Sequence, residues 1–422
     1  MLSLALLIFI LYLGVLIIVT STIEKDISVL HPMWCVFFFM GLQFVSNIYV
    51  LYNERLLHQF VLGSISVPIR AFDLTRALIY EGFAFVAILV AIFIPIKSKS
   101  FKNEAKDEIK VSWFLVVGLL FTMLFFLKAG GIGAYWRQIA LRSSSNAGLG
   151  YYQSIGGYSL LFFYVLSCHN GIRSVFRFIA LVAIASYGSR GLVLIAVLAR
   201  YLYRIDIGFA KMNFYRVALL VPILLVFILS VLSIRKIGFD KFSERPLHNT
   251  LSSISYFEEG FIVRMGRLER ETVILSQFKI QDYWLGKEYF NLLTAPIPRT
   301  IYKDKPAVDT GVFVRLASMG KKYPIDTPAN KIATNSWPQQ NWSGYMNFGL
   351  IGLVAYHFIS GLILKYLYTY RNKSYLNTLV YIMIFVGGGV HLSVPGIVKI
   401  LTLVVLMSVV YSSSKFVKKL SW

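Results

Sequence analysis

The chain has 422 residues, 57% of them hydrophobic, with a mean hydropathy of +0.66 and a formal net charge of +22. Apolar runs of roughly twenty residues recur from end to end, which is the length that a helix needs to cross a ~30 Å hydrocarbon core. These values exclude a soluble globular protein. They predict an all-α polytopic membrane protein. In such a protein the excess of basic residues indicates which loops face the cytoplasm, and it is not a sign of nucleic-acid binding.

Eleven transmembrane helices are predicted, each about as long as the bilayer requires. They cover residues 2–20, 33–52, 75–96, 111–130, 151–168, 172–188, 191–208, 213–233, 347–368, 374–391 and 395–413. Residues 1–233 thus hold eight spans, residues 234–346 form one long hydrophilic loop, and residues 347–422 hold the last three spans and a basic tail. The first run follows no basic segment and precedes no small-residue cleavage pattern, which favours a retained helix over a signal peptide. Cys35 and Cys168 both fall within spans, which argues against a disulfide framework or a cysteine metal site.

The distribution of basic residues predicts which way the chain crosses the membrane. With the N-terminus outside, the cytoplasmic loops and ends carry seventeen Lys and Arg residues, and the short outer loops carry five. These five are Arg55, Arg70, Arg137, Arg142 and Arg190. The asymmetry follows the positive-inside rule and places residues 234–346 outside. A rival topology runs one helix through 178–199, but it moves the later basic loops outside, so we predict that Arg190 forms the tip of an outer hairpin.

Other ionisable residues in or beside the spans also fall near the outer face. They are Arg76, Glu81, Lys128, Lys399 and His391. Such groups usually face a bundle interior or a wet cavity, although a long basic side chain can instead snorkel to the headgroups. Together with the outer arginines they predict an anion site at the membrane boundary, because guanidinium groups pair well with phosphate oxygens. The anion is a lipid-linked phosphate or pyrophosphate, or a soluble anion.

The long outer segment has two parts. Residues 250–278 carry apolar side chains at helical spacing, which predicts an amphipathic helix interrupted near Gly260 that either walls a cavity or covers a core. In residues 285–306, three prolines forbid a regular helix and fix a stiff path from which Arg299, Lys303 and Lys305 project. Nearby Trp and Tyr residues offer flat faces to sugar rings, and the same residue types also mark membrane interfaces.

Three motifs together resemble the Wzy-type oligosaccharide repeat-unit polymerases, which build O-antigen and related bacterial glycans. They are Ser189-Arg190-Gly191, the stretch from Gly286 through Ile297-Pro298-Arg299 to Lys305-Pro306, and Asn347-Phe348-Gly349-Leu350-Ile351-Gly352. The resemblance covers roughly residues 130–365 and implies a helical bundle like those of GT-C-type enzymes and O-antigen ligases. Family members often carry an acidic residue shortly before Asn-Phe-Gly. None is present in "NWSGYMNFG", so no catalytic carboxylate is carried over there.

The resemblance implies a metal-independent glycosyltransferase of the bacterial inner membrane whose active site faces the periplasm. A growing glycan would leave undecaprenyl pyrophosphate for an incoming lipid-linked repeat unit, and this activated donor needs no cofactor. A chain-length regulator and a flippase are the implied protein partners. The reaction needs cations for the departing pyrophosphate and a base for the attacking hydroxyl.

The sequence supplies candidates for both roles. The expected pyrophosphate ligands are Arg76, Arg137, Arg142, Arg190, Arg299 and Lys305. The candidates for the base are Glu81, Glu258, Glu259, Asp304, Asp309, His248 and His391, which the sequence does not rank. Two other functions stay open at this point. An O-antigen ligase would transfer the glycan to lipid A core, and a flippase or exporter would place charges through the membrane depth.

Overall fold

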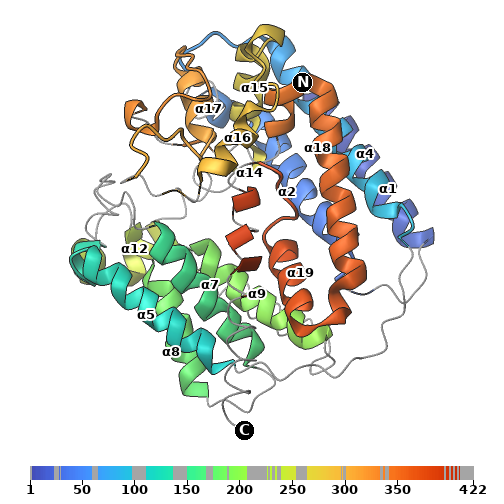
Figure 1. Cartoon of the computed structure of the whole chain (residues 1–422). Helices are drawn as coiled ribbons and strands as arrows, with labels where there is room; N and C mark the ends of the chain where they lie inside the picture. The colour runs from blue at the N-terminus through green and yellow to red at the C-terminus, as the bar shows by residue number, and fades with distance from the viewer. Residues whose placement is uncertain are drawn as a thin grey trace. The chain divides into compact units, whose positions relative to one another are not determined.

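The structure is a computed structural model in which every regular element of the described residues is a helix (Figure 1). It describes residues 2–22, 28, 30–58, 65–96, 111–135, 150–167, 174–187, 190–206, 226, 229–230, 233–234, 239–252, 264–295, 297, 301–332, 336–337, 342–393, 396–398, 401–402, 404–405 and 408. One isolated antiparallel bridge joins Pro306 to Pro328. The all-α prediction is therefore confirmed for this part of the chain.

Three helices are long and apolar enough to cross a membrane. They are α2 (Pro32–Tyr52), α4 (Ala71–Phe93) and the run Ser343–Lys373, which joins α18 (Ser343–Tyr370) to η6 (Arg371–Lys373). Shorter apolar helices cover Leu2–Ile18, Ser112–Lys128, Ser174–Ser186 and Asn377–Val386. The predicted spans at 213–233 and 395–413 lie largely outside the described residues, and the number of eleven spans stays a prediction.

The chain forms two compact units, neither of which is continuous in sequence. Unit 1 comprises Met1–Ser98, Glu259–Thr369 and Gly388–Leu401, and unit 2 comprises Lys99–Glu258, Tyr370–Gly387 and Thr402–Trp422. The predicted outer loop, residues 234–346, is thus divided between the two units at Glu258 and Glu259.

Unit 1 is built on α1 (Leu2–Thr22), α2 and α4, which pack against one another, together with α3 (Glu54–Leu56) and α18. The start of α2 is fixed by Pro32 and by His31, whose Nδ1 accepts a hydrogen bond from the Met33 amide at 3.3 Å. Tyr12 of α1 packs its ring against Phe37 of α2 and Phe85 of α4 at 5.4 and 5.2 Å between centroids. Aromatic packing of this kind joins the three helices.

The outer-loop helices of unit 1 gather at one end of α2, α4 and α18 (Figure 1). They are α14 (Arg264–Gly266), α15 (Leu268–Gln277), η4 (Ile280–Asp282), α16 (Lys287–Thr294), α17 (Gly311–Ser318) and η5 (Ala329–Lys331). The predicted helix over 250–278 is interrupted at Arg267, where φ is 59°. Gly260, the predicted point of interruption, lies outside the described residues.

Unit 2 is a second group of packed helices. They are α5 (Ser112–Lys128), α7 (Gly150–Leu166), α8 (Ser174–Ser186), α9 (Arg190–Asp206), α11 (Phe239–Glu244), α12 (Pro246–Ser252), η6 and α19 (Tyr375–Val386). Gly118 and Gly156 let α5 and α7 approach closely, because a Cβ at either position would overlap a neighbouring side chain. Thr122 and Tyr187 share a buried hydrogen bond of 2.7 Å between their hydroxyls.

Arg190 begins a helix of its own, as predicted. Helix α8 ends at Ser186, α9 begins at Arg190, and the two helices pack against each other. The rival prediction of one continuous helix through 178–199 is therefore wrong.

Helix α18 contains a sharp break at Phe348 and Gly349, inside the Asn-Phe-Gly motif. Gly349 has φ 66° and ψ −150°, a conformation that is essentially restricted to glycine. Before and after the break, Gly344 and Gly352 face each other so closely that a Cβ on either would overlap the backbone of the other. The motif therefore sets the geometry of this break.

We expect Gly349→Ala to lower the free energy of unfolding by about 1–3 kcal/mol, because alanine is strained at this φ and ψ. Its Cβ would also lie 2.6 Å from the Tyr283 hydroxyl. Gly82→Ala is the matched control, since Gly82 lies within α4 with nothing within 4 Å of the new Cβ. Thermal unfolding of the purified proteins in detergent measures both, and equal melting temperatures would contradict the assignment.

Candidate active site

A cluster of buried polar side chains, here called the carboxylate cluster, lies between α2, α4 and α15. It comprises Gln43, Asn47, Glu81 and Glu271, all of which are buried. Gln43 Nε2 donates to Glu81 Oε1 at 2.7 Å and to Glu271 Oε1 at 2.9 Å. Asn47 Nδ2 lies 3.0 Å from each Glu81 carboxyl oxygen. Amide donors thus replace the water that burial removes from both carboxyl groups.

The two carboxyl groups of this cluster cannot both ionise at low cost. Burial first, and then the neighbouring Glu81, raise the pKa of Glu271 well above its usual value, while Arg267 and the Trp342 side chain oppose the shift. The neutral form of Glu271 is therefore favoured relative to a free glutamate, and the two carboxyl groups titrate as a coupled pair beside the Arg267 guanidinium.

Arg267 is held beside this pair by an unusual backbone conformation. Its φ of 59° and ψ of 7° are left-handed, which costs a non-glycine residue roughly 1–2 kcal/mol. The preceding Gly266 packs so tightly against Asn47 that no side chain fits there. Tertiary packing therefore imposes this conformation and keeps the guanidinium close to the carboxylate cluster.

A second group, here called the kink site, surrounds the break in α18. Glu288 of α16 is fully buried and accepts a hydrogen bond from Ser343 Oγ, and the Asn347 and Tyr289 side chains also face it. The Asn347 side chain donates to Ser343 O at 2.9 Å and accepts from the Gly286 amide at 2.9 Å. The sequence motif thus lacks an acidic residue of its own, but the fold brings Glu288 to it.

Backbone hydrogen bonds connect the start of α16 to the broken helix. Trp284 N donates to Met346 O at 3.0 Å, and Leu285 N donates to Asn347 O at 3.2 Å. A helix break leaves carbonyl groups without their usual partners, and these two bonds satisfy them. The outer loop and the break in α18 therefore stabilise each other.

The ionisation of Glu288 is set by its burial. Burial raises the pKa of Glu288 to about 7, although hydrogen bonds from Ser343, Asn347 and Tyr289 favour the charged form. A carboxyl group with this pKa accepts or releases a proton near neutral pH.

Arg76 lies at the edge of an aromatic layer formed by Tyr80, Trp342, Tyr345 and Tyr283. Its Nη2 atom donates to Tyr80 Oη at 3.2 Å, and its guanidinium carbon lies 5.3 Å from the centre of that ring. Tyr345 packs on Trp342, Tyr80 and Tyr283 at 5.6, 6.0 and 5.9 Å. The Arg76 side chain is 26% exposed, and its Nη1 atom lies 3.9 Å from Asp73 Oδ1.

The other predicted anion ligands have different positions. Lys305 is buried, and its Nζ donates to Ala295 O at 2.6 Å and to Ile297 O at 2.9 Å. It therefore fixes the path of the outer loop, and we do not retain it as an anion ligand. Arg190 lies in unit 2, where its backbone begins α9. Arg137, Arg142 and Arg299, together with Lys399, lie outside the described residues.

Among the predicted bases that the structure describes, only Glu81 belongs to the carboxylate cluster or the kink site. Asp304 and His248 are exposed, and His391 is partly buried. Asp309 is exposed and caps its own loop by accepting from Gly311 N at 3.0 Å and Ser336 Oγ at 2.8 Å. Glu258 and Glu259 lie outside the described residues.

Sequence reasoning missed Arg267, Glu271 and Glu288. Glu271 lies on a charged stretch that resembles a solvated helix face, so no local signal distinguished it. A signal for Glu288 was present, because it directly follows the Gly286-Lys287 turn and lies in the stretch that carried the family resemblance.

The fold and the site define a helical protein with apolar helices long enough to cross a membrane and with buried carboxyl groups packed against them. No protein-family model, curated protein or solved structure matches the chain.

The pKa of Glu288 predicts how stability varies with pH. Between pH 4.5 and about 7 the folded protein holds a proton that the unfolded chain has released, so the free energy of unfolding falls as the pH rises. One such group contributes a slope of up to about 1.4 kcal/mol per pH unit. We expect Glu288→Gln to flatten the slope in part, because Glu271 also binds a proton in the folded state.

The measurement is thermal unfolding of the purified protein across this pH range. Glu54→Gln on α3 replaces an exposed carboxylate and is the matched control, which keeps the wild-type slope. An unchanged slope in Glu288→Gln would rule out the assigned ionisation.

Proposed function

We propose that the chain polymerises oligosaccharide repeat units, moving a growing glycan from undecaprenyl pyrophosphate to a sugar hydroxyl of an incoming lipid-linked unit. The observation that carries this proposal is Glu288, held against Ser343 at the break of α18 with a pKa of about 7. That ionisation suits proton removal from a hydroxyl at neutral pH. The break itself falls in the Asn-Phe-Gly motif on which the resemblance to the polymerases rests.

In the proposed reaction the acceptor oxygen attacks the anomeric carbon of the donor glycan, and the bond from that carbon to the phosphate oxygen breaks. The proton of the acceptor hydroxyl passes to Glu288, with Ser343 and the half-buried Tyr289 as the hydroxyl groups beside it. The electron pair of the broken bond stays on the departing lipid pyrophosphate. Positioned cations stabilise the charge that develops there.

Unit 1 supplies two arginines for this anion. Arg76 is partly exposed beside the aromatic layer, and Arg267 is fixed next to the carboxylate cluster. Glu81 and Glu271 lie close enough to Arg267 to attract its guanidinium, so the cluster holds this arginine in place. Arg137, Arg142, Arg190 and Arg299 stay proposed pyrophosphate ligands on the sequence argument alone.

The proposed location is the bacterial inner membrane, with the long loop and the site on the periplasmic side and with a flippase and a chain-length regulator as partners. Three helices able to cross a membrane support this location. The basic residues of the predicted cytoplasmic loops support the orientation.

The carboxylate cluster favours one alternative, the proton-coupled export of a lipid-linked sugar. A buried pair of carboxyl groups that shares one proton can relay protons in transporters. Loss of an exporter leaves lipid-linked units on the cytoplasmic side, whereas loss of a polymerase leaves single units on the outer side. A sidedness assay on spheroplasts carrying Glu81→Gln distinguishes the two.

Purified protein given lipid-pyrophosphate repeat units should form longer glycans without nucleotide, at a rate that rises with pH around a midpoint near 7. We expect Glu288→Gln to lower the rate about 10²–10⁴-fold, the usual contribution of a positioned base. Glu54→Gln should leave it unchanged. Product ladders on gels report the rate, and a wild-type ladder from Glu288→Gln would exclude Glu288 as the proton acceptor.

For the pyrophosphate ligands, we expect Arg190→Ala and Arg299→Ala each to leave glycans that end at a single repeat unit, although the protein still inserts into the membrane. Arg55→Ala, which removes an exposed arginine of α3, serves as the control and should keep normal chains. Glycan ladders and membrane protein levels from cells measure the effect. Normal ladders from both variants would show that these arginines do not hold the pyrophosphate.

A further inference from the structure

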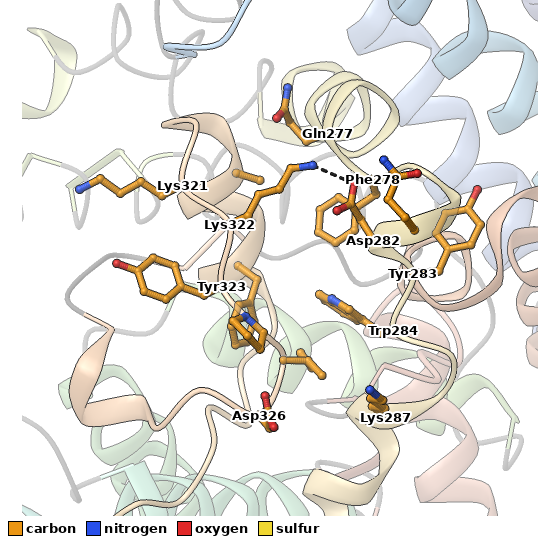
Figure 2. Close-up of a pocket in the computed structure, with 15 residues that line it drawn as sticks. Gln277, Phe278, Asp282, Tyr283, Trp284, Lys287, Lys321, Lys322, Tyr323 and Asp326 are labelled. Atoms are coloured by element: carbon orange, nitrogen blue, oxygen red, sulfur yellow. Dashed lines mark hydrogen bonds and ion pairs between the residues drawn. The ribbon is translucent and has the colours of Figure 1, made fainter.

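A pocket with a volume of about 340 Å³ lies in the outer-loop part of unit 1. It is lined by residues of 277–287, by α17 and by residues 321–326 (Figure 2). Its volume lies at the lower end of the range found for small-molecule sites, which is roughly 300–1,000 Å³. It is separate from the side chains assigned above to proton transfer and pyrophosphate binding.

The apolar wall of the pocket is aromatic and firmly packed. Trp284 meets Phe278 edge to face at 5.5 Å and Phe313 at 5.9 Å between ring centroids. All three side chains are buried to more than nine-tenths in the same hydrophobic core. These buried rings form a rigid base for the pocket, whereas the partly buried Tyr283 and the exposed Tyr323, which also line it, offer ring surface to the C–H face of a sugar.

The polar lining contains charges of both signs. Lys322 Nζ lies 2.8 Å from Asp282 Oδ2, and Figure 2 shows this ammonium pointing at the carboxylate while Lys321 extends away from Trp284. Asp326 and Lys287 line the pocket on the other side of Trp284. An anion would meet two carboxylates here, whereas a hydroxyl group can donate to a carboxylate and accept from an ammonium group. The lining thus fits an uncharged, hydroxyl-rich ligand.

The pocket is joined directly to the kink site. Trp284 lines the pocket and donates its backbone N–H to Met346 O of the broken helix. Lys287 lines the pocket, and the next residue, Glu288, contacts Ser343. Glu288 and Ser343 do not themselves line the pocket, so the connection runs through the backbone of residues 284–288, whose successive Cα atoms are about 3.8 Å apart.

We propose that this pocket binds one or two uncharged sugar residues of the glycan and so presents the chain end to Glu288. This inference rests on the proposed function for the identity of the sugar, but the binding itself is measured without any reaction. The aromatic wall takes the ring face, and Asp326, Lys287 and the Asp282–Lys322 pair take the hydroxyl groups.

The test is equilibrium binding of the repeat-unit oligosaccharide, released from its lipid by mild acid, to the full-length protein in nanodiscs. Asp326→Asn and Lys287→Ala alter exposed side chains, so both variants should fold. Each substitution removes one charge-assisted hydrogen bond to the oligosaccharide, so we expect about tenfold weaker binding. Saturation-transfer NMR and calorimetry measure the affinity. The exposed Lys331→Ala and Glu54→Gln are matched controls and should bind as the wild type does.

Three results would overturn the proposal. They are absence of binding to the wild type, wild-type affinity in both pocket variants, and displacement of the oligosaccharide by inorganic pyrophosphate, which would mark an anion site instead. Glu288→Gln separates this proposal from the proposed function. This variant should bind the oligosaccharide normally but fail to elongate it. If the wild type binds the oligosaccharide through the pocket but does not elongate it, only the proposed polymerase function is refuted.

Discussion

The hydrogen bonds that Gln43 gives to Glu81 and Glu271 join three helices from distant parts of the sequence. Carboxyl groups among apolar helices are tolerated only when each finds donors and a compensating charge. The outer-loop helix α15 supplies Glu271 and follows directly on Arg267, so docking of α15 on α2 and α4 completes the arrangement. Much of the remaining structure of unit 1 depends on this docking, because α15 positions the residues that follow it.

The segment that follows α15 also contacts the break in α18. After α15 the chain passes through η4 to Trp284, whose backbone binds the broken helix, and on to Glu288, which reaches Ser343. The strained backbone at Arg267 and the glycine-only conformation at Gly349 lie on either side of this path. Strain of this kind persists only where surrounding contacts impose it, and it is common at functional sites.

The proposed proton acceptor and the proposed sugar pocket are joined by one short helix but use different side chains. Glu288 lies under the surface, where burial sets its pKa, and the preceding Lys287 lines an open pocket. If both proposals hold, the same packed helix positions the base and a residue that binds the glycan. Packed helices hold side chains more precisely than free loops do.

The sequence by itself determined the helical class, the position of most helices and the separate start of a helix near Arg190. These follow from local properties, namely apolar run length and charge distribution. The Asn-Phe-Gly stretch was singled out by its resemblance to the polymerases and not by a local property. Glu81 was also recognisable, because an acidic residue inside an apolar run needs a partner. Its partners were not, since Gln43 lies 38 residues from Glu81 in the sequence and also bonds to Glu271, which is 228 residues from Gln43.

Only the tertiary structure decided which polar residues act together. It brought Glu288 to Ser343 across 55 residues and so supplied the carboxylate that the motif itself lacks. It also turned Lys305 from an expected anion ligand into a buried support of the loop. Hydrogen-bond partners and desolvation depend on packing between distant segments, and no local pattern in the sequence records that packing.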